Sequence, residues 1–183
     1  MKVILRPGTP EDAAPCGQIW FEAFRSIAAE HNFPGAFASA EVAIGLIETC
    51  LSHPELYSVV AESDGRVLGS NFVDERNPIA GIGPITVDPA VQNQTIGRQL
   101  MLDVLARCAQ RGVAGVRLVQ SAYNNVSLCL YTNLGFETRE MLSKIDGEPL
   151  GIGFPDMRCG PPSKATCLRA TRCATGAWPQ SWR

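Results

Sequence analysis

The sequence predicts an α/β protein with a central mixed, mostly antiparallel sheet of about six or seven strands and about four helices on both of its faces. Two observations support this class. Short apolar segments of strand length alternate with amphipathic segments whose apolar residues recur at a spacing of three and four. Glycine, proline and Asp-Gly turn signals separate these segments, and their order along the chain is β-α-α-β-β-β-α-β-α-β-β.

The N-terminal part is expected to contain a strand followed by two helices. Residues 3–6 form the strand. Thr9-Pro10-Glu11-Asp12 is typical of a helix start, with a hydroxyl N-cap, a proline in the first turn and two acids beside the positive end of the helix dipole. The first helix carries apolar residues at helical spacing, namely Ile19, Trp20, Ala23, Phe24 and Ile27. The second helix begins near Ser39. The apolar residues on one of its faces are Val42, Leu46, Ile47 and Leu51.

The rest of the chain is expected to complete the sheet. Strands at 56–62 and 67–74 flank the hairpin turn Ser63-Asp64-Gly65-Arg66, and residues 78–87 form a third strand of this run. A helix is expected at 97–111. The side chains on its core-facing side are Leu100, Met101, Val104, Leu105 and Cys108. The remaining expected elements are a strand at 113–120, a short helix at 125–134 with Gly135 as its C-cap, and two strands at 136–144 and about 150–154.

Size and composition limit what the chain can bind. One domain with a sizeable core is expected at residues 1–158, and residues 159–183, which lack periodicity, are expected to form a loose C-terminal appendage. Charged residues make up 19% of the sequence and the formal net charge is −2, so no basic surface for nucleic acid is predicted. No apolar run approaches the roughly 18 residues of a membrane span, and residues 1–6 begin a strand rather than a signal peptide. We therefore expect a cytoplasmic protein with neither nucleic acid nor a membrane as partner.

The seven cysteines are interpreted as thiols rather than as disulfides or metal ligands. Four of them fall among apolar residues of predicted helices, which favours reduced, buried thiols: Cys16, Cys50, Cys108 and Cys129. The other three, Cys159, Cys167 and Cys173, have long spacings, no Cys-x-x-Cys pair and no nearby histidine. We therefore expect no metal site.

The segment Val87 to Leu100 is the first that points to a ligand. A strand there ends at Asp88-Pro89 and leads into a helix through a turn that contains Gly97. Such a turn leaves unpaired N–H groups at the positive end of the helix dipole, which suits phosphate. No Gly-Lys-Ser/Thr follows, which excludes a Walker loop, and the glycine spacing of a dinucleotide-binding turn is missing.

Two blocks of sequence make the resemblance specific. VDPAVQNQTIGRQL at 87–100 resembles the acetyl-CoA signature Gln/Arg-x-x-Gly-x-Gly/Ala of the GNAT superfamily of N-acetyltransferases, including the V-x-P before it. NNVSLCLYTNLGF at 124–136 resembles the Asn-x-x-Ala/Ser-x-x-Leu-Tyr-x-x-x-Gly-Phe helix of that family. The two blocks occur in the family's order, and the resemblance extends over about residues 3–154. It implies a GNAT-like fold with acetyl-CoA as co-substrate.

The resemblance also implies residues that bind the cofactor. The pyrophosphate would lie on the turn formed by Gln92, Asn93, Gln94, Thr95, Ile96, Gly97 and Arg98. The strand Ile85-Thr86-Val87 would offer backbone groups to the pantetheine amides, much as another strand would. The Arg98 side chain either adds charge there or is only a solvated helix residue. Asn124 either contacts the arm of CoA or caps the helix that begins at Asn125, and both roles are compatible.

Tyr131 is the residue implied for catalysis, with Phe33 and Phe37 as candidates for the acceptor site. The thiolate of CoA needs a proton when it leaves, and a tyrosine can supply one; the alternative is a core tyrosine on an apolar helix face. Trp20 and Phe24 have the spacing of core residues, whereas Phe33 and Phe37 lie in a loop segment. No acid lies in residues 79–87, so we name no general base. The acids at neighbouring strand ends are Glu62, Asp74 and Glu75, and by chemistry alone His31 and His53 are also candidates; surface and loop positions are the commoner roles for such residues.

Two functions remain open. The first is an enzyme that moves an acetyl group from acetyl-CoA to a primary amine, which could belong to a small molecule or to a protein. The alternative is a non-catalytic module of the same fold that binds CoA, senses it or serves a partner. Thr95 favours the second, because it stands where the family pattern has its first glycine and would be strained at a positive φ. The resemblance also allows a homodimer.

Overall fold

The computed structural model describes residues 2–92 and 94–143. Residues 2–139 belong to one unit; residues 140–143 belong to a second unit and contain no helix or strand. The strand expected at about 150–154, the boundary after residue 158, the expected appendage 159–183 and its three cysteines lie outside the described residues.

The described residues form a six-stranded sheet with four α-helices, which confirms the predicted fold class. The strands are β1 (Ile4–Pro7), β2 (Leu56–Ser63), β3 (Arg66–Asp74), β4 (Ile79–Ile82), β5 (Thr86–Val87) and β6 (Gly115–Arg117). The helices are α1 (Ala13–Glu30), α2 (Ala40–Ser52), α3 (Ile96–Arg111) and α4 (Asn125–Thr132), with 3-10 turns η1 (Pro10–Asp12) and η2 (Pro89–Val91). The strand order is β1-β2-β3-β4-β6, and β5 also pairs with β3. Only β4 and β6 run parallel.

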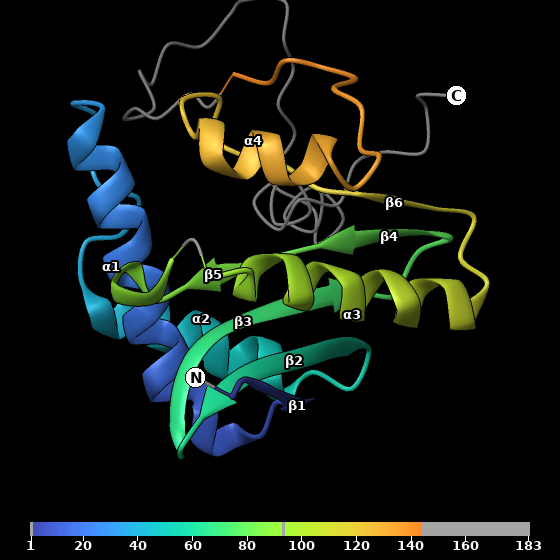
Figure 1. Cartoon of the computed structure of the whole chain (residues 1–183), viewed down its shortest axis with the longest axis horizontal. Helices are drawn as coiled ribbons and strands as arrows, with labels where there is room; N and C mark the ends of the chain where they lie inside the picture. The colour runs from blue at the N-terminus through green and yellow to red at the C-terminus, as the bar shows by residue number, and fades with distance from the viewer. Residues whose placement is uncertain (1, 93, 144–183) are drawn as a thin grey trace, which may run out of the picture. The chain divides into compact units, whose positions relative to one another are not determined.

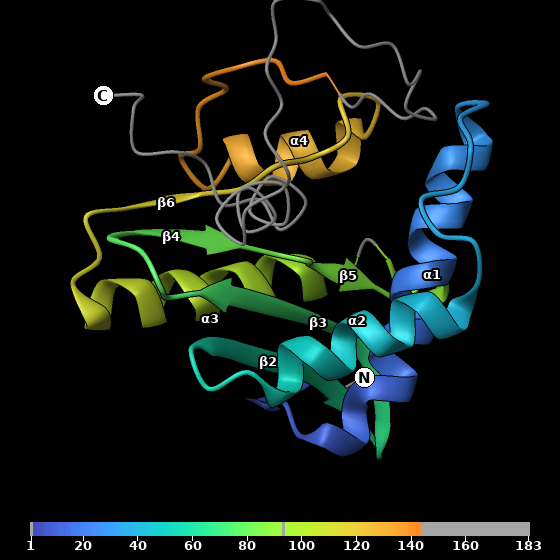
Figure 2. The same cartoon turned by 180° about the vertical axis from the view of Figure 1, so that it is seen from behind.

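Helices cover both faces of the sheet. α3 crosses one face, and α1 and α2 cover the other (Figures 1 and 2). Successive side chains of β2 point to opposite faces of the sheet, so the buried side chains form two clusters. Val59 belongs to the cluster under α3, and Val60 belongs to the cluster under α1 and α2. The α3 side also contains Leu68, Ile96, Leu100, Met101, Val104 and Tyr131. Both α3 and α4 therefore pack on the same core.

The predicted helix start at Thr9 and Pro10 is a 3-10 turn in the structure, and α1 itself begins at Ala13. The carboxylate of Asp12 accepts the backbone N–H of Thr9 at 2.8 Å and two hydrogen bonds from Arg6 at 2.7 and 2.8 Å. Nε of Arg6 also donates to Glu62 at 2.8 Å. Asp12 is only 4% exposed, so a nearly buried charge joins β1, the helix start and β2.

The predicted inner face of α2 is wrong in part. Val42 and Leu46 are 47% and 44% exposed, whereas Ala43 and Ile47 are fully buried. The reason is a close approach of the two helices: a Cβ added at Gly17 of α1 would lie 2.5 Å from the Cα of Ile44. Small residues therefore form the contact, and the larger apolar residues lie outside it.

The structure also changes three predicted strands. Residues 78–87 form two strands instead of one, because Pro84 has no N–H to donate to the ladder. The strand expected at 113–120 is shorter, Gly115–Arg117. Residues 136–143 contain no strand, and residue 144 lies outside the description. Within the described part of the chain, no helix is long and apolar enough to cross a membrane.

Candidate functional site

β5 presents backbone groups along one edge. Thr86 and Val87 pair with Ser70 and Gly69 of β3, and the N–H of Asp88 donates to the carbonyl of Leu68 at 2.8 Å. Hydrogen-bonded and non-hydrogen-bonded pairs alternate in an antiparallel ladder. The N–H and C=O of Val87 therefore point away from β3. Ile85 immediately precedes the strand and packs against the α3 core.

The neighbouring ladder ends before it reaches β5. β4 pairs with β6 from Ile79 to Gly81, opposite Gly115 to Arg117. In the described residues no pairing joins β5 to the chain that follows β6. Figure 1 shows β5 continuing the line of β4 while β6 leads away to α4. In that following segment Oε1 of Gln120 is buried without a hydrogen-bond partner.

The turn before α3 is short and carries little charge. Thr95 is the N-cap of α3 with a left-handed backbone, φ 65°. Among the described residues no side chain caps this helix end, and the Thr95 hydroxyl instead accepts a hydrogen bond from Nε2 of Gln99 at 3.2 Å. Nε2 of Gln92 donates to the Val87 carbonyl at 3.3 Å, so the turn is tied to the open edge of β5. Asn93 lies outside the described residues.

The other predicted residues of the turn differ in exposure. Gln94, Thr95 and Arg98 are exposed, and Ile96 is buried in the α3 core. A Cβ at Gly97 would meet Leu130 and Val87 at ordinary contact distances of 3.5 and 3.7 Å, so an alanine would fit there as well. Gly97 therefore lies between β5 and α4, where all three elements meet.

The other two predicted residues belong to α4, one at its start and one near its end. Oδ1 of Asn124 accepts the backbone N–H of Ser127 at 3.1 Å, which makes Asn124 the N-cap of the helix. Tyr131 is 7% exposed, belongs to the α3 core and packs against Phe136 with ring centroids 6.0 Å apart. Burial raises the pKa of Tyr131, and the Ser127 hydroxyl only partly opposes this shift. The phenol is therefore held in its protonated form at neutral pH.

The carboxylates considered as bases are engaged elsewhere. Glu62 is bonded to Arg6, Asp74 to Arg76 and Glu75 to Arg107. Hydrogen bonds from these arginines lower the pKa of Asp74 and of Glu75. Both are therefore weaker bases than a free carboxylate. Nor do three or more His, Cys, Asp and Glu side chains gather as a metal site in the described part of the chain.

The cysteine prediction holds only in part. Cys16 and Cys108 are buried and Cys50 is half-buried, and the pKa of all three is raised by burial. Cys129 is exposed, contrary to the prediction. It stands two residues before the inward-facing Tyr131, so it projects from the other side of α4.

The two predicted acceptor residues lie in different surroundings. Phe37 packs against Trp20 with ring centroids 4.7 Å apart and lines a cavity of about 240 Å³ with Phe21, Arg25, Gly35, Ala36 and Ala38. Phe33 is 53% exposed and stacks on Tyr123 at 4.5 Å. Sequence reasoning missed Tyr123, although it immediately precedes the Asn124 block.

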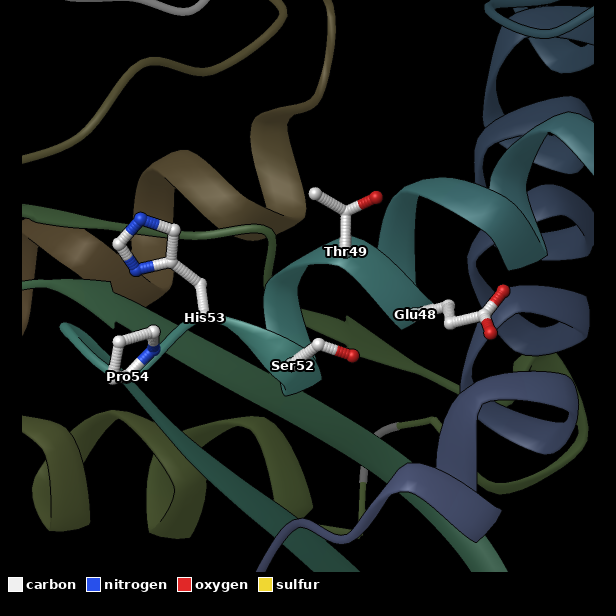
Figure 3. Close-up of a pocket in the computed structure, with 5 residues that line it drawn as sticks. All are labelled: Glu48, Thr49, Ser52, His53 and Pro54. Carbon is white, nitrogen blue, oxygen red and sulfur yellow. The ribbon is translucent and has the colours of Figure 1, made fainter.

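A larger depression, of about 460 Å³, lies at the end of α2 and contains none of the predicted site residues. It is lined by Glu48, Thr49, Ser52, His53 and Pro54. Figure 3 shows Glu48 and His53 pointing in opposite directions, so the two ionisable groups do not converge on a common ligand.

The described residues fit the acetyl-CoA that the resemblance implies. An uncapped helix start suits a pyrophosphate, and the outward N–H of Val87 suits an amide or a thioester carbonyl. The buried Oε1 of Gln120 is an acceptor that has no hydrogen-bond partner among the described residues. The hydroxyl of Thr95 leaves its own proton free to donate, since its oxygen already accepts from Gln99.

Known proteins share both the sequence pattern and the fold. Residues 19–136 match the acetyltransferase (GNAT) family. The chain is 30% identical over 111 residues to mycothiol acetyltransferase of Nocardia farcinica, a match that covers 58% of this chain and 37% of that protein. The chain therefore spans less than half the length of the curated relatives it matches.

Solved structures with little sequence identity share the fold. A mutant of the BH1408 protein from Bacillus halodurans superposes with a TM-score of 0.67 at 12% identity, over 79% of this chain and 99% of that one. PaiA N-acetyltransferase from Thermoplasma acidophilum, in complex with coenzyme A, gives 0.59 at 18% identity, over 77% and 93%. At such identities the likeness shows the fold alone.

Proposed function

Because the chain belongs to the acetyltransferase (GNAT) family, we propose that it transfers an acetyl group from acetyl-CoA to a primary amine by direct attack. The observation that carries this proposal is the open edge of β5. The backbone of Val87 faces away from β3 and lies beside the turn that leads into α3. The turn proposed to bind phosphate and the strand edge thus lie next to each other, as an extended phosphate-bearing ligand requires.

The cofactor would be held mainly by backbone groups. The amides of the turn from Gln92 through Arg98 would take the pyrophosphate, with the Arg98 side chain free to add charge because it is exposed. The backbone of Ile85 to Val87 would pair with the pantetheine amides. Asn124 uses its carbonyl oxygen to cap α4, which leaves its amide N–H₂ group for the arm of CoA.

The chemistry would need a polarised carbonyl and a proton for the leaving group. A backbone N–H on the outer edge of β5 would stabilise the oxyanion that develops when the amine attacks the thioester. As the C–S bond breaks, Tyr131 would donate its phenolic proton to the thiolate. The ordinary pKa of a tyrosine lies well above neutral and burial raises that of Tyr131 further, so the phenol carries its proton before the reaction starts, as a general acid must.

The acceptor is proposed to be the amine of a small, weakly charged molecule. The curated relatives are named mycothiol acetyltransferases, which points to a small-molecule acceptor for those proteins. In this chain Phe33 and Phe37 would form apolar parts of the wall of the acceptor site, and an apolar wall would not attract a polycation. A protein amine is the competing acceptor. We also propose a cytoplasmic location. We further propose a homodimer, which sedimentation of the purified chain tests.

Calorimetric titration with acetyl-CoA tests the cofactor directly. We expect binding in the micromolar range by the parent and at least equal affinity for Thr95→Gly. If only the glycine variant binds, the turn is the site but Thr95 closes it. If neither variant binds, the assignment of residues 92–98 to the pyrophosphate is wrong.

A non-catalytic CoA-binding module remains the second candidate, favoured by the positive φ of Thr95 and by the ion-paired carboxylates. The variant Tyr131→Phe separates the two functions. An enzyme that uses the phenolic proton would lose turnover by about 100-fold while keeping its affinity for acetyl-CoA. A binding module would show no turnover with any amine, and its acetyl-CoA affinity would be the same in both forms.

A further inference from the structure

The two faces of β5 differ in chemistry. Val87 packs against the cluster under α3, which also contains Tyr131. Successive side chains of a strand point to opposite faces, so Thr86 lies on the other face of the sheet, the one that α1 covers (Figures 1 and 2). Its partner in β3, Ser70, also pairs with Val60, which belongs to the cluster under α1 and α2. β5 therefore presents an apolar side chain to α3 and a hydroxyl to α1.

Buried polar atoms without a partner gather on this α1 face. In the described part of the chain four buried side-chain atoms have no hydrogen-bond partner, and three of them are Oγ1 of Thr86, Oγ of Ser70 and Nε1 of Trp20. The Trp20 ring packs against the cluster under α1 and α2. Cys16 of α1 lies beside Ser70, whose hydroxyl partly opposes the rise that burial causes in the pKa of the thiol, but the two groups lack the geometry of a hydrogen bond. Buried polar atoms are nearly always bonded in native proteins, so this concentration indicates a ligand.

Thr86 lies within reach of a ligand on the open edge of β5. It directly precedes Val87, whose N–H points away from β3 and suits a thioester carbonyl. A ligand that pairs with this edge as another strand would lies about 4.8 Å from β5. Neighbours on one face of such a pair have Cβ atoms about 4.5–5.5 Å apart. A group on the α1 face of the bound thioester can therefore form a hydrogen bond with the Thr86 hydroxyl.

The same arrangement indicates the side from which the amine attacks. A carbonyl that accepts a hydrogen bond from the outward N–H of Val87 lies near the plane of the sheet, so its two faces look towards α3 and towards α1. Packed side chains fill the α3 side, including Tyr131, which would protonate the sulfur. The α1 side carries the Thr86 hydroxyl. It is also the side of Phe37, a proposed wall of the acceptor site, because Phe37 packs on Trp20.

We infer that Oγ1 of Thr86 binds the acceptor amine, accepting one of its N–H groups on the α1 side of the thioester. This inference rests on the proposed function. The hydroxyl oxygen has lone pairs that no donor uses in the described part of the chain. The hydrogen bond holds the amine so that its nitrogen lone pair faces the acetyl carbon, and Thr86 takes up no proton in this role. An uncharged hydroxyl offers no ion pair to an ammonium ion, so the contact favours the neutral amine, which is the form that attacks.

The test removes the hydroxyl while keeping the shape of the side chain. Thr86→Val is compared with the parent at saturating acetyl-CoA, using the best acceptor for the parent among phenylethylamine, glucosamine and putrescine. We expect kcat/KM for the amine to fall about 10-fold, as the loss of one hydrogen bond predicts, while the affinity for acetyl-CoA in calorimetry stays parental. Stability in urea should rise, because an apolar group replaces a buried hydroxyl that has no partner. Thr86→Ser, which keeps the hydroxyl, should retain most of the parental kcat/KM.

Ser70→Ala is the matched control. It removes a buried hydroxyl without a partner from the same face, but β3 pairs with both β2 and β5, so Ser70 lies one strand further from the open edge. This variant should keep parental kcat/KM.

Four results would overturn the assignment and leave the acetyltransferase proposal standing. They are parental kcat/KM in Thr86→Val, an equal fall in Ser70→Ala, weaker acetyl-CoA binding by Thr86→Val, and lower stability of Thr86→Val, which would mean that the protein itself satisfies the hydroxyl. A parent that binds acetyl-CoA but acetylates no amine would overturn both the assignment and the proposed function.

Discussion

The left-handed backbone conformation of Thr95 should lower the stability of the fold, and a substitution of this one residue measures the effect. It is a β-branched residue at φ 65°, where glycine is the favoured residue. The left-handed region costs such a side chain about 1–2 kcal/mol, partly offset by the entropy that glycine loses on folding. We expect Thr95→Gly to raise the free energy of unfolding by about 1 kcal/mol in urea denaturation.

Asp64 is the matched control for this substitution. It has φ 51° in the hairpin between β2 and β3, but aspartate tolerates the left-handed region. Asp64→Gly should therefore change stability by less than Thr95→Gly does. Equal gains in the two variants would show that the threonine is not specially strained. The sequence identified Thr95 as a departure from the pattern, while its φ became known only from the structure.

At the scale of elements, β5 depends on a glycine in its partner strand. A Cβ added at Gly69 would lie 2.4 Å from the carbonyl oxygen of Thr86, closer than any real contact, and that atom is backbone. Gly69→Ala should therefore displace β5, lower the free energy of unfolding by about 1–3 kcal/mol and weaken acetyl-CoA binding. Urea denaturation and calorimetry measure the two effects.

Gly115→Ala provides the control in the same sheet. No atom lies within 4 Å of a Cβ built at Gly115 in β6, so this variant should be neutral in both measurements. If Gly69→Ala also kept parental stability and affinity, β5 would not be held by that close approach, and the proposed role of its edge would lose its support.

Local patterns predicted the helices better than the strands. The bounds of α3 and the N-cap of α4 follow from periodicity and capping residues, which act over a few positions. The division between β4 and β5 falls at Gly83-Pro84, where the N–H of Gly83 still donates to the Phe72 carbonyl at 2.8 Å but Pro84 has no N–H to donate. The stacking of Phe33 on Tyr123 likewise joins residues far apart in the sequence. Neither contact leaves a periodic signal.

At the scale of the whole molecule, acid should destabilise the fold. Arginine hydrogen bonds hold the pKa of Asp12, Asp74 and Glu75 below the usual values of about 3.9 for aspartate and about 4.3 for glutamate. A depressed pKa contributes stability that is complete above the unfolded-state value. That contribution is lost as the pH falls through the folded-state value. Urea unfolding between about pH 7 and about pH 3 should therefore show falling stability below about pH 5.

The Arg6 variant tests whether the buried carboxylate contributes to this slope. Removing the guanidinium in Arg6→Met leaves Asp12 nearly buried without its cation, which should cost about 2–3 kcal/mol at neutral pH. The pKa of Asp12 would then rise, so stability would fall less steeply with acid than in the parent. Arg25→Met, which removes only the exposed pair with Glu22, should cost less than about 0.5 kcal/mol. An unchanged pH slope in Arg6→Met would mean that the link between β1, the start of α1 and β2 does not set acid stability.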